Sequence, residues 1–397
     1  MCIESGVLGI NAIRRNFGTS DLLFKIAAAH SASIFSCGQL VSSERDCYEM
    51  PSKHIFGYYG SWATYRSGKG RCAAEDIDPY SCTHLIYAFA KPTSSGDVQL
   101  VDYNLSFAGF NGLRNRNPSL KTLIGIGGAT VGGYIFSSIA GNASLRSTFA
   151  KNARQFCQTY GFNGVDIDWE FPEGGDRYNF VQMLSELSSE LGGYDLLLTA
   201  SVGPSEYRAS QSYDIPGIAR CVDYILLMAY DYNGSWDSYT GHNAPLYSGS
   251  SDSEFQKQLN IDHSVRYWKR QGAPSHKLIL GLATFGRTFT LSNSSNNGFR
   301  NNASGAGHAG PYTNESGILA YYEIQERFGE TRWDSEQCVP YAVSGNQWVG
   351  FDNTRSIQRK CEYIKSQGLG GAMVWSIDMD ERRGGSFTLL NTIKQCL

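Results

Sequence analysis

Short apolar runs recur along the chain, and longer stretches with helical spacing separate them. Most runs are apolar at every position, which is typical of parallel strands buried on both faces. The intervening stretches include 143–160 and 179–191, where Leu184, Leu187 and Leu191 fall on one helical face. The eight runs are 55–59, 84–90, 122–126, 164–168, 197–202, 223–229, 278–284 and 371–375. Eight such strand–helix units predict an α/β fold, a TIM (β/α)8 barrel.

The gap after the seventh run is too long for a single helix. Between 287 and 346 the composition shifts to Asn, Ser, Gly and Tyr, which predicts a small α+β insertion domain between strand 7 and helix 7. We expect short strands there and one helix near 316–328, followed by a helix at 354–367. The predicted barrel then comprises 52–286 and 347–397. Residues 1–51 have no counterpart in the repeating pattern and form a leader of unclear role.

Charge and composition narrow the classes of partner. A net charge of −3 over 397 residues argues against binding to nucleic acid or to an acidic membrane surface. No run of 18 apolar residues occurs, which argues against a membrane-spanning helix. The stretch from Leu22 to Leu40 is interrupted by Lys25 and His30, so it is either a poor signal segment or part of a non-native start.

Two further patterns bear on localisation. Six Asn-X-Ser/Thr motifs favour an extracellular, secreted protein; they lie at Asn104, Asn142, Asn233, Asn293, Asn302 and Asn314. The ten cysteines allow disulfide bonds, although the pattern does not define their connectivity. No two cysteines have CxxC spacing, which argues against a zinc site.

The most informative segment holds three carboxylates at alternate positions, Asp166, Asp168 and Glu170. On a strand these side chains share one face, with successive ones about 6.5–7 Å apart, and Val165 and Ile167 take the other face. Burial and like charge raise the pKa of at least one carboxyl, which then supplies a proton near neutral pH. Glu170 is outermost, at the strand end where barrel enzymes place their chemistry.

The alternatives for this segment are a solvated acidic strand or a divalent-metal site. A metal site would leave the flanking Trp169 and Phe171 unexplained, and no His lies nearby in the sequence. We therefore expect no metal and no cofactor.

The segment from Phe162 to Pro172 resembles the DGxDxDWE signature of family 18 glycoside hydrolases, the chitinases and their inactive relatives. The similarity extends from His54 to Ile393 and is greatest to animal chitinase catalytic domains. Further matching segments are Gly57–Trp62, Cys82–Phe89, Gly125–Gly128, Met228–Asp231, Gly234–Trp236 and Gly370–Trp375.

The resemblance implies a retaining mechanism in which the substrate's own 2-acetamido oxygen is the nucleophile. Glu170 would protonate the glycosidic oxygen, Asp168 would orient the acetamido N–H, and Asp166 would share a proton with Asp168. Tyr230 and Asp231 match residues that contact the acetamido group and the sugar at the cleavage position.

Aromatic residues form a second group, because the apolar faces of sugar rings stack on aromatic planes. Trp375 matches the floor of the cleavage subsite in the family. The expected substrate-binding residues are Trp375, Tyr58, Phe89, Met228, Trp236, Arg287 and Trp62. Core packing is the alternative for Tyr58 and Phe89, because a barrel interior needs large side chains. Arg287 is expected to bond a sugar hydroxyl or Asp231, or else to be a solvated charge.

The chain departs from the family pattern at a few positions. Asn163 replaces an Asp of the signature and is expected to serve a turn. Ala129 stands where many relatives carry a Trp that stacks a sugar on the leaving-group side. Gly57 and Gln325 replace family cysteines, so the usual disulfides cannot form, and a Cys72–Cys82 bond is the substitute we consider.

Three hypotheses remain: an endo-type chitinase that cleaves bonds inside the polysaccharide, a chitin-binding lectin on the same fold, and a hydrolase of N-glycan cores. Inactive relatives typically lack the acid at the position of Glu170, which favours the enzyme. The expected partners are chitin or chito-oligosaccharides, and the expected state is a monomer.

Overall fold

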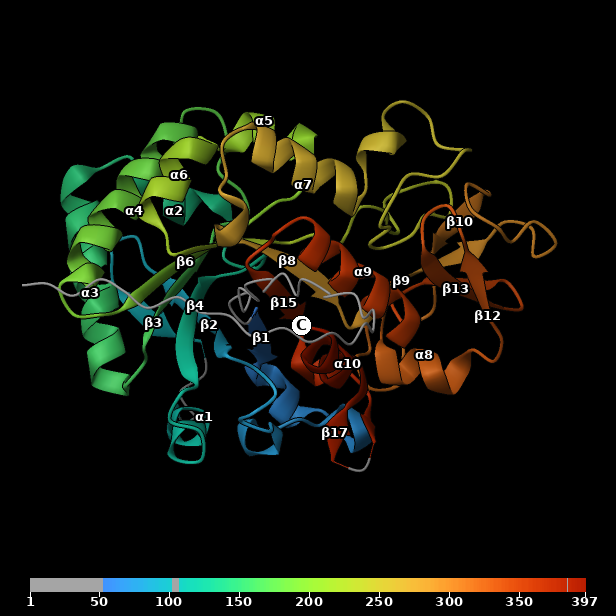
Figure 1. Cartoon of the computed structure of the whole chain (residues 1–397), viewed down its shortest axis with the longest axis horizontal. Coiled ribbons are helices and arrows are strands. Elements are labelled where there is room, and N and C mark those ends of the chain that lie inside the picture. Colours follow the sequence, from blue (N-terminus) through green and yellow to red (C-terminus); the bar gives the residue numbers. More distant parts are fainter. Residues whose placement is uncertain (1–52, 102–106, 384) are drawn as a thin grey trace, which may run out of the picture. The chain divides into compact units, whose positions relative to one another are not determined.

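The computed structural model describes residues 53–101, 107–383 and 385–397, and the predicted leader lies outside them. Eight parallel strands form its central sheet in the order β1-β15-β8-β7-β6-β5-β4-β2, and β1 also pairs with β2 (Figure 1). The sheet is therefore closed, and the predicted TIM (β/α)8 barrel is confirmed. The strands are β1 His54–Gly60, β2 His84–Pro92, β4 Lys121–Gly127, β5 Gly164–Asp168, β6 Leu197–Val202, β7 Tyr224–Leu227, β8 Leu278–Ala283 and β15 Gly371–Trp375.

All eight apolar runs coincide with these strands, because each strand is covered on both faces. A short strand, β3 (Val98–Leu100), adds to β2 in the antiparallel direction. The helices within the described residues are α1 Phe107–Gly112, α2 Gly133–Ala140, α3 Ala143–Tyr160, α4 Asp176–Gly192, α5 Glu206–Ser212, α6 Ile215–Cys221, α7 Ile261–Arg270, α8 Tyr321–Arg327, α9 Thr354–Ser366 and α10 Thr388–Cys396. None of these helices is long and apolar enough to span a membrane.

Local sequence explains the limits of α3, the longest of these helices. The side chain of Asn142 accepts a hydrogen bond from the backbone N–H of Leu145 and so caps the first turn. Gly161 ends the helix with φ +75°, a left-handed conformation that glycine adopts without steric cost. The next residues enter β5, so this turn sets the position of the carboxylate row along the barrel axis.

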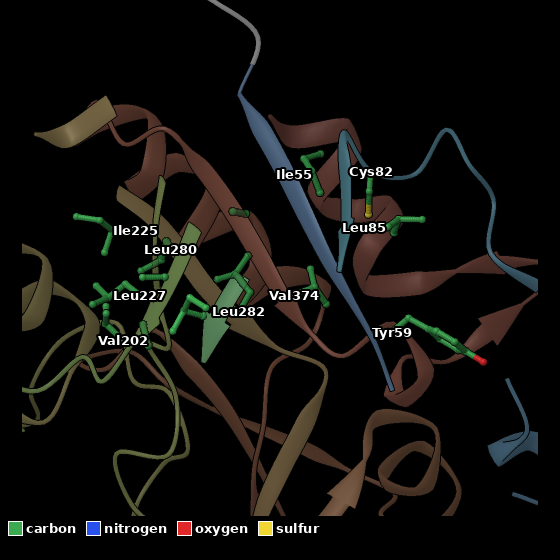
Figure 2. Close-up of a cluster of buried hydrophobic side chains, with 14 of the residues drawn as sticks. Ile55, Tyr59, Cys82, Leu85, Val202, Ile225, Leu227, Leu280, Leu282 and Val374 are labelled. Atoms are coloured by element: carbon green, nitrogen blue, oxygen red, sulfur yellow. The ribbon is translucent and has the colours of Figure 1, made fainter. Parts of the chain in front are cut away.

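The main core lies between the barrel and its helices. Side chains on the outer face of the strands, such as Ile55, Leu227, Leu280 and Val374, are buried in it (Figure 2). Val165 and Ile167 of β5 belong to the same core. Asp166 and Asp168 face the barrel interior instead, beside Thr199 and Ser201 on β6. The predicted division of β5 into an apolar and an acidic face is thus confirmed.

A second, antiparallel sheet stands between β8 and α9, in the order β10-β9-β14-β13-β12, with β11 paired to β9. Its strands are β9 Phe285–Leu291, β10 Ala303–Ala306, β11 Ile318–Ala320, β12 Thr331–Asp334, β13 Val339–Ser344 and β14 Gln347–Gly350. The helix expected near 316–328 begins only at Tyr321, because β11 occupies the preceding residues. The predicted limits at 287 and 346 fall inside β9 and just before β14, whereas the sheet spans 285–350.

Candidate active site

The carboxylate row crosses the barrel interior and ends at its carboxyl-terminal mouth. Asp166 is wholly buried, Asp168 is almost so, and Glu170 lies two residues beyond the end of β5, partly open to a cavity. The cavity has a volume of about 490 Å³. Among the predicted site residues, its walls include Tyr58, Asp168, Glu170, Met228, Tyr230, Asp231, Arg287 and Trp375.

Asp166 does not reach the cavity and is held beneath it by hydroxyl groups. Its Oδ2 accepts hydrogen bonds from the Tyr58 hydroxyl at 2.5 Å and from Ser201 Oγ at 3.2 Å. Its Oδ1 accepts one from Thr199 Oγ1 at 2.6 Å. Burial raises the pKa of Asp166, and these donors lower it by stabilising the carboxylate.

Asp168 lies between Asp166 and Glu170 and has an unused acceptor. Its Oδ1 is buried without a hydrogen-bond partner among the described residues. A buried polar atom without a partner costs free energy, so this oxygen is prepared for a donor that arrives from the cavity. Burial, followed by the charges of Glu170 and Asp166, raises the pKa of Asp168 well above its usual range.

Glu170 carries the property required of an acid catalyst. Burial raises its pKa to about 7, and the nearby charge of Asp231 contributes to the rise. A carboxyl group with this pKa is partly protonated at neutral pH and can both donate and accept a proton. The row of three acids therefore holds fewer than three negative charges near neutrality.

Two glycines, one at the end of β4 and one in the following turn, allow this part of the chain to approach the backbone of Asp168 closely. A Cβ atom on Gly127 would overlap the backbone carbonyl of Asp168, and φ there is +125°. The N–H of Gly128 donates to that same carbonyl at 2.9 Å, and its φ is +87°. A Cβ on Gly128 would also collide with the ring of Phe89, so both positions require glycine.

Tyr230 and Asp231 also line the cavity. Tyr230 is buried, and burial together with the nearby acids raises the pKa of its phenol, which therefore stays a hydrogen-bond donor. Asp231 binds Arg287 through both carboxylate oxygens, at 2.7 and 2.8 Å. Of the alternatives for Arg287, the structure thus supports the bond to Asp231.

An aromatic cluster extends the cavity past Glu170. The rings of Trp375 and Phe89 stack at 5.8 Å, and Trp62 stacks on Phe89 at 6.3 Å. A second cavity of about 810 Å³ is lined by Trp62 and Phe89, and it shares Ala129, Glu170 and Trp375 with the first. The hollow therefore continues on both sides of Glu170.

Trp236 lines neither of these two cavities. It is 60% exposed, and the guanidinium of Arg287 lies 5.1 Å from its ring centroid. Residues that the sequence analysis missed include Thr199 and Ser201 under the row, Asn243, which binds the backbone N–H of Asp231, and Arg208 and Glu315 on the cavity wall. Thr199 and Ser201 were detectable, because they are polar residues at alternate positions of an apolar run.

Two expectations about structural residues have clear outcomes. The Asn163 side chain accepts hydrogen bonds from the backbone N–H of Thr122 and from Arg114, so it ties β4 to β5 at the far end of the barrel, as a structural role predicts. The Cys72–Cys82 bond considered from the sequence is not formed, because the two cysteines are free and have different surroundings. Cys72 donates to the backbone at Ala73, whereas Cys82 lies against Gly57.

A closed (β/α)8 barrel with a row of acids at its mouth and aromatic walls defines a glycoside hydrolase. The model of the Glycosyl hydrolases family 18 matches residues 54–380, and the chain belongs to this family.

The chain is similar to several characterised members. It is 40% identical to chitotriosidase-1 of Mus musculus, over 85% of this chain and 76% of that protein. It superposes on a group IV chitinase of Ostrinia furnacalis, solved also with allosamidin, with a TM-score of 0.84 and 40% identity, covering 87% of this chain. That match covers 100% of the unliganded chitinase chain and 98% of the chain with allosamidin. Human YKL-39, described as a pseudo-chitinase that retains chito-oligosaccharide binding, matches with a TM-score of 0.84 and 34% identity, covering 87% of this chain and 99% of that one.

Proposed function

We propose that the protein is a chitinase that hydrolyses β-1,4 bonds between N-acetylglucosamine units inside a chain. The observation that carries this proposal is Glu170, an acid with a pKa of about 7 that faces both cavities. Because the hollow continues on both sides of this acid, sugars fit before and after the bond to be cut. That arrangement favours cleavage within a chain over removal of terminal sugars.

In the first step, protonated Glu170 gives its proton to the glycosidic oxygen as the bond to the anomeric carbon breaks. The acetamido oxygen of the same sugar attacks that carbon and forms an oxazolinium ion, so no enzyme carboxylate becomes covalently attached. The unused Oδ1 of Asp168 accepts the acetamido N–H and stabilises the positive charge. The Tyr230 hydroxyl is the donor for the acetamido oxygen.

In the second step, ionised Glu170 removes a proton from water, which attacks the anomeric carbon and opens the oxazolinium ring. Two displacements return the β configuration. Asp166 shares its proton with Asp168 as the charge on the substrate rises and falls, which its three hydroxyl donors support. Trp375, with Tyr58 and Phe89 packed against it, is the floor on which the reacting sugar stacks.

The second candidate function is that of a lectin that binds chito-oligosaccharides without cutting them. The similarity to YKL-39 motivates it, since that protein is described as a pseudo-chitinase. The presence of Glu170 next to Asp168 favours the enzyme, because a binding protein has no need of an acid with a raised pKa.

The test is hydrolysis of chitohexaose, with the products sized by mass spectrometry, for the wild type and for Glu170→Gln. We expect the variant to lose at least 100-fold in turnover, as is typical when a general acid is removed, while calorimetry still detects oligomer binding. Glu173→Gln is the matched control, because Glu173 is an exposed carboxylate three residues away. An inactive wild type that binds the oligomer would instead support the lectin.

We further propose that the protein is secreted and monomeric and that 285–350 is an insertion domain that walls the cleft. Arg287 and Glu315 line the 490 Å³ cavity from this part of the chain. Among the glycosylation motifs in the described residues, Asn142, Asn293, Asn302 and Asn314 are exposed and accessible to a glycosyltransferase. Asn233 is buried and binds Arg300, so it is excluded as an acceptor in the folded protein.

A further inference from the structure

Seven cysteines lie in the described residues, and all of them are thiols. Most are isolated from one another. Cys157 donates to the carbonyl of Gly164, Cys221 lies against the carbonyl of Val181, and Cys338 donates to Ser335 in a turn of the second sheet. Cys361 and Cys396 differ from these, because they lie on two helices, α9 and α10, that pack directly against each other.

Both residues lie on the core-facing sides of their helices. Cys361 is 1% exposed and shares one face of α9 with Ile357 and Ile364, four and three residues away. Cys396 is the last residue of α10 and packs against the same core as Leu389 and Ile393 of that helix. This helical spacing places both thiols in the layer between α9 and α10.

The two helices are direct neighbours around the barrel (Figure 1). The Cys396 thiol is among the groups that raise the pKa of the Cys361 thiol. A disulfide bond requires Cα atoms about 4.4–6.8 Å apart, a separation that residues at the contact of two packed helices can have. For no other cysteine of the described residues does a second thiol contribute to a raised pKa.

We propose that Cys361 and Cys396 form a disulfide bond that fastens the C-terminal helix α10 to α9. The two thiols together lose two protons and two electrons to an external disulfide such as oxidised glutathione. That oxidant becomes two molecules of reduced glutathione, and one S–S bond replaces two S–H bonds. An oxidising compartment supplies this oxidant.

Burial also determines when the bond can form. It raises the pKa of the Cys361 thiol to about 12, so this residue has almost no thiolate at neutral pH once the helices are packed. Thiolate is the species that reacts in disulfide exchange. Closure therefore accompanies the docking of α10 during folding, and the finished bond is slow to reduce in the native protein.

The covalent loop would enclose β15 and the turn that follows it. Trp375 ends β15, and Asp378 in the turn binds the side chain of Arg66 and the backbone N–H of Gly60 on the β1 side. The disulfide would thus secure the last strand of the barrel on the side where the barrel closes against β1. Its effect falls on stability rather than on the chemistry of Glu170.

The test is a peptide map of the full chain secreted by a eukaryotic host, denatured in iodoacetamide without reductant and cut with trypsin. We expect the peptide 361–365 joined to the peptide 395–397, two hydrogen masses below the sum of the free peptides. Cys157 should be alkylated in the same digest. Alkylation of both Cys361 and Cys396, or a bond from either one to a different cysteine, would overturn the proposal.

A thermal measurement separates the bond from simple packing. Cys361→Ala, Cys396→Ala and the double variant should all melt lower than the wild type. The loss from the double variant should be smaller than the two single losses combined, because either change alone removes the bond. Closing a loop of this length predicts a Tm fall of roughly 3–6 °C. Fully additive losses, or variants that match the wild type, would contradict a disulfide.

Discussion

Arg287 binds both carboxylate oxygens of Asp231, and this pair lines the same cavity as Glu170. Asp231 has φ +59° and is held there by a bond from its N–H to Asn243. Asn tolerates this left-handed conformation as well as Asp does, so Asp231→Asn removes a charge without straining the backbone.

The first prediction concerns the pH dependence of that variant. Glu170 acts in its protonated form, so kcat/KM of the wild type should fall as the pH rises through about 7. The Asp231 charge helps to raise the pKa of Glu170, so in Asp231→Asn the alkaline limb should move to lower pH. Glu315→Gln, which removes another acid from the same cavity wall, should leave the limb in place. A limb that is unchanged or higher in Asp231→Asn would contradict this coupling.

Glu170 should also lower the free energy of unfolding at alkaline pH. Its pKa is raised on folding, so the folded state binds the proton more tightly and stability falls as the pH rises from about 4.5 to about 7. Glu170→Gln removes this loss. At pH 8 the variant should have a higher Tm than the wild type, with a free energy of unfolding larger by on the order of 1 kcal/mol. At pH 4 the two Tm values should be close. Scanning calorimetry of both proteins at pH 8 and pH 4 measures this. A difference in Tm that is the same at both pH values would contradict the raised pKa of Glu170.

The hydroxyls beneath the row should matter to both folding and turnover. Thr199→Val keeps the side-chain shape but leaves Oδ1 of Asp166 without its donor at 2.6 Å. We expect a loss of about 1–3 kcal/mol in stability and a several-fold fall in kcat, because the pKa of Asp166 rises and its proton is less readily shared. Thr288→Val is the matched control, since the Thr288 hydroxyl is buried without a partner in the described residues. Similar effects in both variants would mean that the Asp166 bond has no special role.

Ala129 makes the two cavities wider where they meet. It is exposed and lines both of them. Ala129→Trp should tighten the binding of long oligomers by several-fold, because an aromatic face adds stacking area for one more sugar. Ala129→Leu adds apolar volume without a flat ring and should gain less. Calorimetric titration of both variants with chitohexaose measures this, and a weaker or unchanged affinity for the Trp variant would show that sugars follow another path.

The last prediction tests whether the substrate supplies the nucleophile. Asp168 ends β5 and Glu170 follows it by two residues, so both approach the sugar from similar directions and no second carboxylate of the row lies across the scissile bond. Cleavage should therefore require an N-acetyl group on the sugar before the cut. NMR of fresh products from partly deacetylated chitosan should show reducing ends that are N-acetylated and in the β configuration. Reducing ends that are mostly glucosamine, or an early α anomer, would exclude substrate assistance.

The barrel could be predicted because its strands are covered on both faces, so each appears as a continuous apolar run such as 278–284. The second sheet was harder to delimit. Phe285 and Arg287 belong to β9 but directly follow the run of β8, and only the antiparallel pairing of β9 with β14 reveals the boundary.

The three acids of the row could be predicted from their alternation, and Asp231 from the resemblance to the family, whereas their hydrogen-bond partners could not be predicted. Asn243 and Arg208 lie in irregular or polar segments whose path depends on the whole fold. The Cys72–Cys82 bond considered from the sequence is not formed, since the two cysteines are free and have separate partners. Cys361 and Cys396 are farther apart in sequence, but they lie on helices α9 and α10, which pack against each other.

The pairing of β1 with β15 has a consequence for synthesis of the protein. β1 can pair with β15 only after β15 has been synthesised, so nearly the whole chain must leave the ribosome before the closing pair can form. Until then the unpaired edge of β1 and the buried acids of β5 remain open to water and to other chains. Premature stop codons before the end of β15 at Trp375 should therefore yield chains that chaperones hold and proteases remove, rather than shortened enzymes with partial activity.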